Sequence, residues 1–175
     1  MFAAPALALL LSTTIQAAST GTVTFNGELT QNTCDVSIEG RGPDATIVLP
    51  TVLTGLLQTP GQTAGLQQFA MVLSNCAGPL RYIAAYFEAG PTVDGMTGRL
   101  KNTNSTGATN VSLQLLNQMQ NSNPIQAGNQ NQVANNNYAV ITGSTAMVYA
   151  VQYYAEGVTT PGVVNSSVVY SLMYK

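Results

Sequence analysis

Eight residues decide the fold that we expect for this chain: Val168-Val169-Tyr170-Ser171-Leu172-Met173-Tyr174-Lys175. Successive side chains of a β-strand point to opposite faces of its sheet, so apolar residues at every second position form one apolar face. That face consists here of Val168, Tyr170, Leu172 and Tyr174. The pattern predicts a core strand, yet no residues follow Lys175 in the sequence to form its next neighbour. We therefore expect an unfilled place beside this strand.

A second alternating segment lies near the other end of the sequence, at residues 20–30. One of its faces holds Val23, Phe25, Gly27 and Leu29. The segment has two interpretations: it is the first strand of its own domain, or it fills the unfilled place, either within the same chain or in a neighbouring molecule. Taken with the last strand, it favours a neighbour from a different molecule, because an added strand completes both the backbone ladder and the apolar core.

The composition excludes several classes of function. At 175 residues the chain is long enough for one domain with a sizeable core. Only 7% of its residues are charged and the net charge is −2, against about 25% charged residues in ordinary soluble domains. The basic residues are scattered, which argues against nucleic-acid binding. They are Arg41, Arg81, Arg99, Lys101 and Lys175.

The sequence offers little for catalysis. Histidine is absent, which removes the usual general base and the commonest metal ligand. The acidic residues form no short paired-carboxylate motif, and neither a nucleophile elbow nor a glycine-rich phosphate loop is present. We therefore predict that the protein is not an enzyme and has no catalytic residues, no metal ligands and no cofactor.

Residues 1–17 are predicted to be an export signal. An apolar run over residues 2–11 leads to small residues at the expected cleavage site, after Ala17. The run is too short to span a bilayer, so no direct membrane insertion is expected. No Lys or Arg precedes it, which indicates a truncated start. A buried N-terminal helix or strand is the alternative.

Export explains the two cysteines, Cys34 and Cys76. Two cysteines in an oxidising compartment usually pair, and a bridge closing a loop of this length stabilises by roughly 4 kcal/mol in the chain-entropy model. Two free thiols or half of a metal site are the alternatives. The lack of histidine and of a CxxC spacing favours the disulfide.

The rest of the pattern predicts an all-β protein. Short alternating segments are separated by Gly, Pro and Asn, and none shows a sustained 3.6-residue apolar period. Strands are predicted at residues 34–38, 46–49, 69–76, 80–88, 111–116, 145–154 and 163–174. Residues 55–68 are expected to be a loop with at most a turn of helix, and residues 117–137 a polar surface loop. Strands at this spacing favour a sandwich of two sheets.

Four features together resemble the pilin subunits of chaperone–usher fimbriae, close to the type 1 major subunits. Residues 21–29 are similar to that family's N-terminal extension, with Gly27 at the position of its glycine. The two cysteines match its single disulfide, and residues 69–76 resemble the strand that leads into the second cysteine. Gly162, fourteenth from the C-terminus, and the penultimate Tyr174 match its C-terminal signature.

The resemblance implies an all-β, incomplete immunoglobulin-like sandwich that lacks its last strand and is completed by donor-strand complementation. Residues 18–33 would be the donor extension and residues 34–175 the pilin domain. The implied donor positions are Val23, Phe25, Gly27 and Leu29. The strand that borders the acceptor groove, and that a periplasmic chaperone contacts, would include Gly162, Val168, Tyr170, Leu172 and Tyr174.

The implied function is a structural subunit of a bacterial surface fimbria that polymerises by donor-strand exchange and supports adhesion and biofilm formation. The implied partners are identical or related subunits joined head to tail, a periplasmic chaperone and an outer-membrane usher. The protein would pass through the periplasm into an extracellular fimbrium. One alternative is a minor or adaptor subunit of the same system. Another is a stand-alone secreted carbohydrate-binding sandwich that uses Tyr82, Tyr86, Phe87, Tyr149, Tyr153 and Tyr154.

Overall fold

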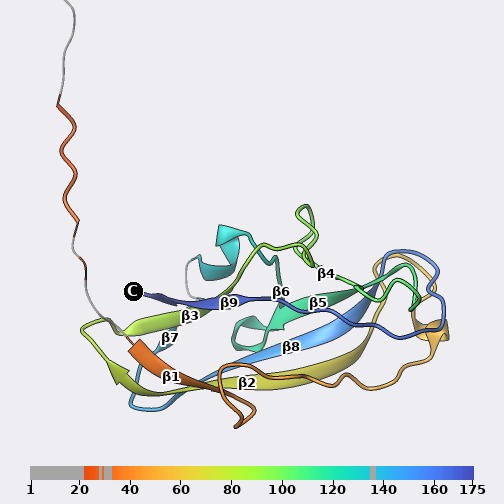
Figure 1. Cartoon of the computed structure of the whole chain (residues 1–175), viewed down its shortest axis with the longest axis horizontal. Coiled ribbons are helices and arrows are strands. Elements are labelled where there is room, and N and C mark those ends of the chain that lie inside the picture. Colours follow the sequence, from red (N-terminus) through yellow and green to blue (C-terminus); the bar gives the residue numbers. More distant parts are fainter. Residues whose placement is uncertain (1–21, 28, 30–32, 135–136) are drawn as a thin grey trace, which may run out of the picture.

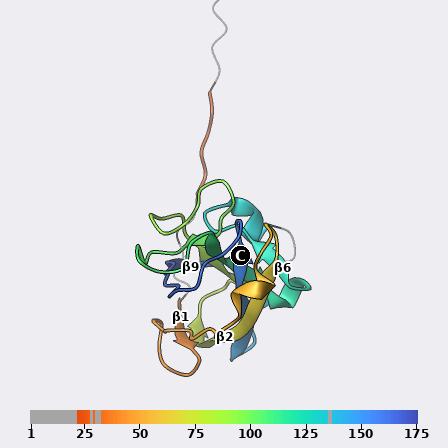
Figure 2. The same ribbon diagram turned by 90° about the vertical axis from the view of Figure 1, so that its right-hand side faces the viewer.

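Two antiparallel β-sheets pack around one apolar core in the computed structural model, which describes residues 22–27, 29, 33–134 and 137–175 (Figures 1 and 2). The larger sheet has the order β1 (Thr33–Ile38), β2 (Thr63–Ala77), β8 (Thr145–Ala155), β5 (Val111–Asn117) and β4 (Leu100–Lys101). A short strand, β6 (Asn123–Ile125), also pairs with β5. The smaller sheet has the order β7 (Ala139–Val140), β3 (Tyr82–Phe87) and β9 (Tyr170–Tyr174).

Helical structure in the described residues is limited to short 3₁₀ turns: η1 (Thr54–Leu56), η2 (Gln118–Gln120) and η3 (Gln130–Val133). None of the helices in these residues has the length and apolar character needed to cross a membrane. The prediction of an all-β, immunoglobulin-like sandwich is confirmed.

Alternating residues of the long strands fill the core. Buried side chains at every second position of β2, β8 and β3 are Phe69, Met71, Leu73, Met147, Tyr149, Val151, Ile83, Ala85 and Phe87. The edge of one aromatic ring meets the face of another between the sheets, because Phe87 of β3 and Tyr149 of β8 lie with ring centroids 5.2 Å apart at 89°. The two sheets therefore share a single core.

Cys34 and Cys76 form the predicted disulfide. Cys34 lies at the start of β1 and Cys76 at the end of β2, and β1 pairs with the last part of β2, from Met71 to Ala77. The bridge therefore fastens β1 to β2, its one neighbour in that sheet among the described residues.

The start of β2 differs from the prediction. The strand begins at Thr63, whereas residues 55–68 were expected to be a loop. The pairing of β2 with β8 shifts register between Ala64 and Gln67, and Gly65 there has a φ of +67°. Such a bulge breaks the two-residue period, so the early part of the strand shows no alternation in the sequence. The turn of helix expected in this region is η1.

Three other predicted boundaries are wrong. Residues 46–49 form no strand, and only the last part of 163–174 is a strand, β9. The residues before β9 bond to a loop instead: the Ala108 amide donates to the Val163 carbonyl at 3.0 Å, and the Thr103 amide donates to the Asn165 carbonyl at 2.8 Å. Residues 117–137 contain β6, η2 and η3 as well as loop.

The described N-terminal residues run away from the sandwich (Figure 1). Residues 22–27 form no strand. The side chains of Val23, Phe25 and Leu29 are 74%, 89% and 102% exposed, and a Cβ atom placed on Gly27 would meet no atom within 4 Å. In this structure the segment therefore pairs with neither sheet. The predicted export signal lies outside the described residues.

Candidate functional site

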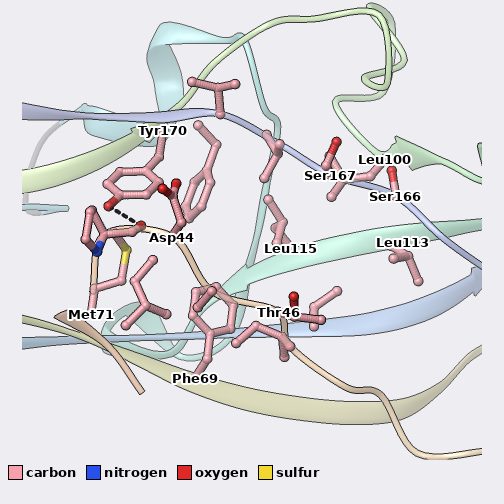
Figure 3. A pocket seen from close by; sticks show the side chains of 18 of the residues that line it. Asp44, Thr46, Phe69, Met71, Leu100, Leu113, Leu115, Ser166, Ser167 and Tyr170 are labelled. Carbon is pink, nitrogen blue, oxygen red and sulfur yellow. Dashed lines mark hydrogen bonds between the residues drawn. The ribbon is translucent and has the colours of Figure 1, made fainter. Parts of the chain in front are cut away.

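A groove of about 760 Å³ opens between the two sheets, beside β9 (Figure 3). One bank consists of residues 166–172, and the other of residues 43–47 together with Leu49. The floor consists of core side chains: Ile38, Phe69, Met71, Phe87, Leu100, Leu113, Leu115 and Val151. The groove therefore gives access to the apolar core of the sandwich.

The side chains of the β9 bank keep the predicted alternation. Val168, Tyr170 and Leu172 point inward, are partly buried and pack against the core. Val169, between two of them, is 71% exposed. The inward residues stay only partly buried because the groove lies beside them, which matches a strand with a neighbour on one side.

The backbone of β9 is bonded along one edge. Lys175 and Tyr82 exchange both of their hydrogen bonds, at 3.1 and 2.9 Å, and the Glu88 amide donates to the Val169 carbonyl at 2.8 Å. Bonded and non-bonded residues alternate along an antiparallel pair, so the amides and carbonyls of Tyr170 and Leu172 face the other edge. None of the described strands pairs with that edge. The groove thus offers backbone donors and acceptors beside apolar side chains.

The opposite edge of the smaller sheet is closed by side chains. The Gln132 side chain accepts a hydrogen bond from the Phe87 amide at 2.8 Å and donates one to the Phe87 carbonyl at 2.9 Å. The Tyr149 hydroxyl accepts from the Ala85 amide at 3.3 Å, and β7 pairs with the start of β3. The open edge is therefore a property of β9 and not of the whole sheet.

Tyrosines cross from β9 toward the larger sheet. The Tyr170 hydroxyl donates to the Pro43 carbonyl at 2.8 Å and so bridges the two banks of the groove (Figure 3). Burial, with a smaller contribution from the negative charge of Asp44, raises the pKa of Tyr170. Burial also raises the pKa of Tyr174, although a hydrogen bond with the Cys34 backbone partly opposes the shift.

The structure places the predicted groove residues in three situations. Val168, Tyr170 and Leu172 line the groove. Tyr174 lies at the end of β9, where it packs against the core outside the lining. Gly162 lies outside the lining in the loop before β9. Its φ is +155°, and a Cβ atom there would lie 2.3 Å from the Ala108 amide nitrogen, so close packing of two loops requires glycine at this position.

Sequence reasoning missed the second bank of the groove. Residues 46–49 were expected to form a strand, but residues 43–49 act as a wall instead. The sequence feature that could have identified this wall is the alternation within the stretch, because Ile47 and Leu49 face the core, whereas Val48 is 78% exposed. The described residues contain no group of His, Cys, Asp and Glu side chains that could hold a metal ion.

Of the six aromatic residues of the carbohydrate-binding alternative, Tyr82 alone is exposed, at 47%, so they do not form a surface platform. Tyr86, Phe87 and Tyr149 are buried. Tyr153 and Tyr154 are partly buried, and the ring of Tyr154 is covered by the Arg99 guanidinium, 3.9 Å from the ring centroid. Stacking on a sugar needs exposed ring faces, so the arrangement favours packing over sugar binding.

The fold and the groove define a class of protein: an immunoglobulin-like sandwich whose distinctive surface is an open sheet edge. Residues 49–175 match the family model described as Type-1 fimbrial protein, A, and the chain belongs to this family. The major fimbrial subunit SMF-1 of Stenotrophomonas maltophilia is 42% identical over 161 residues, which cover 90% of this chain and 94% of that protein. The F17 fimbrial protein of Escherichia coli is 36% identical over 163 residues, covering 89% and 87%.

Two solved structures of pilus subunits have a fold similar to that of this chain. The P pilus rod subunit PapA has a TM-score of 0.60 at 16% identity, covering 81% of this chain and 99% of PapA. A chain from a chaperone–usher pilus has a TM-score of 0.61 at 19% identity, covering 90% and 96%. The fold is therefore that of the chaperone–usher pilins. Together with the family membership, this makes the protein a structural subunit of a bacterial surface fimbria, which assembles with other subunits.

Proposed function

We propose that successive copies of this chain join head to tail by donor-strand exchange, with part of the extension at residues 18–33 of one copy entering the β9 groove of the next. One observation carries this: the same chain holds an exposed, alternating apolar segment and an open apolar groove with which that segment makes no pairing. Each copy has one donor and one acceptor at different places. Such contacts do not close on themselves, so they build a fibre.

The energetics favour insertion. Val23, Phe25 and Leu29 are largely exposed, and burying each side chain contributes roughly 1.5–3 kcal/mol. The inserted backbone would also pair with the amides and carbonyls of Tyr170 and Leu172. Ordering the extension offsets part of this gain, and the surplus holds the subunits together.

Gly27 would suit the part of the groove that the Tyr170 side chain bridges. The Tyr170 side chain bridges the groove to the Pro43 carbonyl and so occupies space that an inserted side chain would need. Gly27 lies on the same face as the apolar donor residues and has no side chain. A strand inserted with Gly27 beside Tyr170 would leave the bridge intact, whereas a larger residue would have to displace it.

Secretion and assembly follow from the same surfaces. Residues 1–17 would direct export, and the disulfide would form in the periplasm before assembly. A periplasmic chaperone would cover the open edge of β9 by lending a strand, which prevents edge-to-edge aggregation. At an outer-membrane usher, the next subunit's extension would replace that strand. The resulting extracellular fimbria would support adhesion and biofilm formation.

A pair of substitutions in the full chain tests the insertion. Phe25→Asp places a charge on the face that would be buried, and burying an unpaired carboxylate is strongly unfavourable. We expect no fibres by negative-stain electron microscopy of cells that express the whole assembly system. Thr24→Asp adds the same charge one residue away, on the opposite face, and should assemble normally. Equal fibre yield from both variants would overturn the proposed function.

A further inference from the structure

An exposed apolar patch lies at the end of the sandwich far from the N-terminal extension. It consists of Leu53 and Leu56, around η1, and Val158, in the loop after β8; they are 78%, 56% and 61% exposed. The two segments lie together because the amide and the hydroxyl of Thr159 both donate to the Leu57 carbonyl, at 3.2 and 3.0 Å. Figure 2 looks onto this end, with η1 in gold. We call these three residues the far-end patch.

The chain segments that carry the far-end patch are poor in charge, and the charged residue nearest to Val158 in the sequence, Glu156, is paired with Arg99. Residues 45–80 and 157–174 contain no charged side chain. Exposed apolar clusters in uncharged surroundings mark interaction surfaces more often than scattered apolar residues do. Surfaces that bury against another protein are likewise depleted in charge at their centre.

We propose that the far-end patch docks against the body of the subunit whose extension occupies the groove, a second copy of this chain. This contact rests on the proposed function but is separate from the inserted strand. It would make the joint between successive subunits a two-part contact, with one part inside the groove and one outside it.

The direction of insertion brings the second copy to this end. The strand pairings in the described part of the sandwich are antiparallel, so a strand added to β9 in the same style runs opposite to it. Its C-terminal end then leaves the groove beyond Ser166, the last lining residue on that bank, and the chain before Ser166 leads back through the loop that holds Val158. On the other bank, Leu49 is the last lining residue and lies four positions before Leu53. Both banks therefore lead to the far-end patch.

The segment that connects the inserted strand to the donor's own sandwich is short, which keeps the two subunits close together. The donor face ends at Leu29 and the body begins with β1 at Thr33. Four residues span at most about 14 Å when fully extended. The start of the donor's β1 must therefore lie within that distance of the groove exit, which leaves the two bodies in reach of contact.

The end of the body that follows the extension offers a matching surface. Tyr82 and Val140 are cross-strand partners on β3 and β7, and they are 47% and 54% exposed. Tyr82 also bonds to Lys175, which places this pair at the end of the molecule where the chain's C-terminus lies (Figure 1). The contact between the far-end patch of one subunit and the Tyr82–Val140 pair of the next can therefore repeat along a head-to-tail fibre.

Charge substitutions separate this contact from the inserted strand. In the full chain, Leu53→Asp combined with Leu56→Asp should leave binding of a labelled peptide with the sequence of residues 20–31 unchanged, because the groove is untouched. Assembly into fibres should slow by about tenfold or more, since burial of apolar side chains is lost. Met96→Asp is the matched control, because Met96 is 93% exposed and lies elsewhere. Loss of peptide binding would show a folding defect, and assembly equal to that of the control would overturn the contact.

A photo-crosslinking residue at position 56 detects the far-end contact directly, and a folding defect cannot produce the same crosslinks. In assembled fibres we expect crosslinks to the neighbour's residues around Tyr82 and Val140, identified by mass spectrometry. Crosslinks only to other parts of the neighbour, or none in fibres of normal length, would overturn the far-end contact while leaving donor-strand exchange in place. Failure of Phe25→Asp to block assembly would instead remove the proposed function itself.

Discussion

Tyr149 shows how one hydroxyl group supports the sheet that carries the groove. It is 2% exposed and lies in β8 of the larger sheet, yet its hydroxyl accepts a hydrogen bond from the Ala85 amide in β3. Tyr149→Phe leaves that buried amide without a partner and should lower the free energy of unfolding by about 1–3 kcal/mol. Denaturant unfolding of the mature chain measures the change. Tyr153→Phe, in the same strand and partly exposed, is the control and should have a smaller effect.

The same residue predicts a loss of stability in alkali. Burial raises the pKa of Tyr149 to about 12, with the Ala85 hydrogen bond partly opposing the shift, against about 10 in the unfolded chain. The folded state favours the neutral phenol, so the stabilisation is complete below pH 10 and is lost as pH rises toward 12. The loss amounts to about 2–3 kcal/mol. Tyr149→Phe should flatten this part of the stability profile, and an unchanged profile would contradict the assignment.

At the scale of elements, Gln132 helps to close one edge of the smaller sheet, together with Tyr149 and β7. Its side chain takes the place of a paired strand at Phe87, accepting from the amide and donating to the carbonyl. Gln132→Ala should leave the Phe87 amide unpaired, while the Phe87 carbonyl keeps its hydrogen bond from the Gly128 amide at 2.8 Å. The free energy of unfolding should fall by about 1–3 kcal/mol. Gln130→Ala, in the same 3₁₀ turn and exposed, is the control. Hydrogen exchange at the Phe87 amide should rise only in the Gln132 variant, and equal exchange in both would contradict this role.

The elements also show what the sequence could reveal. Stretches with an uninterrupted period of two were predicted as strand, because half-buried strands imprint their alternation on the sequence. Residues 145–154 cover all of β8 except its last residue, and residues 69–76 cover most of the second half of β2. The bulge at Gly65 removed that signal from the first part of β2. In residues 163–169 exposed and partly buried side chains alternate, but the bonding partner is a loop, and periodicity does not identify a partner.

The candidate site was predictable on one side only. Val168, Tyr170 and Leu172 carry a clear apolar face and were assigned to the groove, where the structure places them. The second bank was missed as a wall because residues 43–49 pair with no strand and reach the groove through tertiary packing. Gly162 was grouped with the groove through a resemblance, whereas the contact that requires glycine there is with Ala108.

At the scale of the whole molecule, the proposed donor and acceptor would give each subunit two different ends. The N-terminal extension leaves the sandwich at the end where β1 begins, and the groove runs along β9 toward the end formed by η1 (Figure 1). An interior subunit of a fibre must both receive an extension and supply one. A subunit that only receives is confined to one end of the fibre.

This polarity gives a prediction for mixed fibres. When an epitope-tagged Phe25→Asp chain is co-expressed with the unaltered chain, the tag should appear at one end of each fibre and nowhere along its length, because the variant accepts an extension and donates none. A tagged Thr24→Asp chain should label the whole length, since its donor face is unchanged. Immunogold electron microscopy reads both patterns. Tag along the interior of fibres that contain Phe25→Asp would mean that subunits are joined without an inserted apolar strand, and would place the joint on surfaces outside the groove.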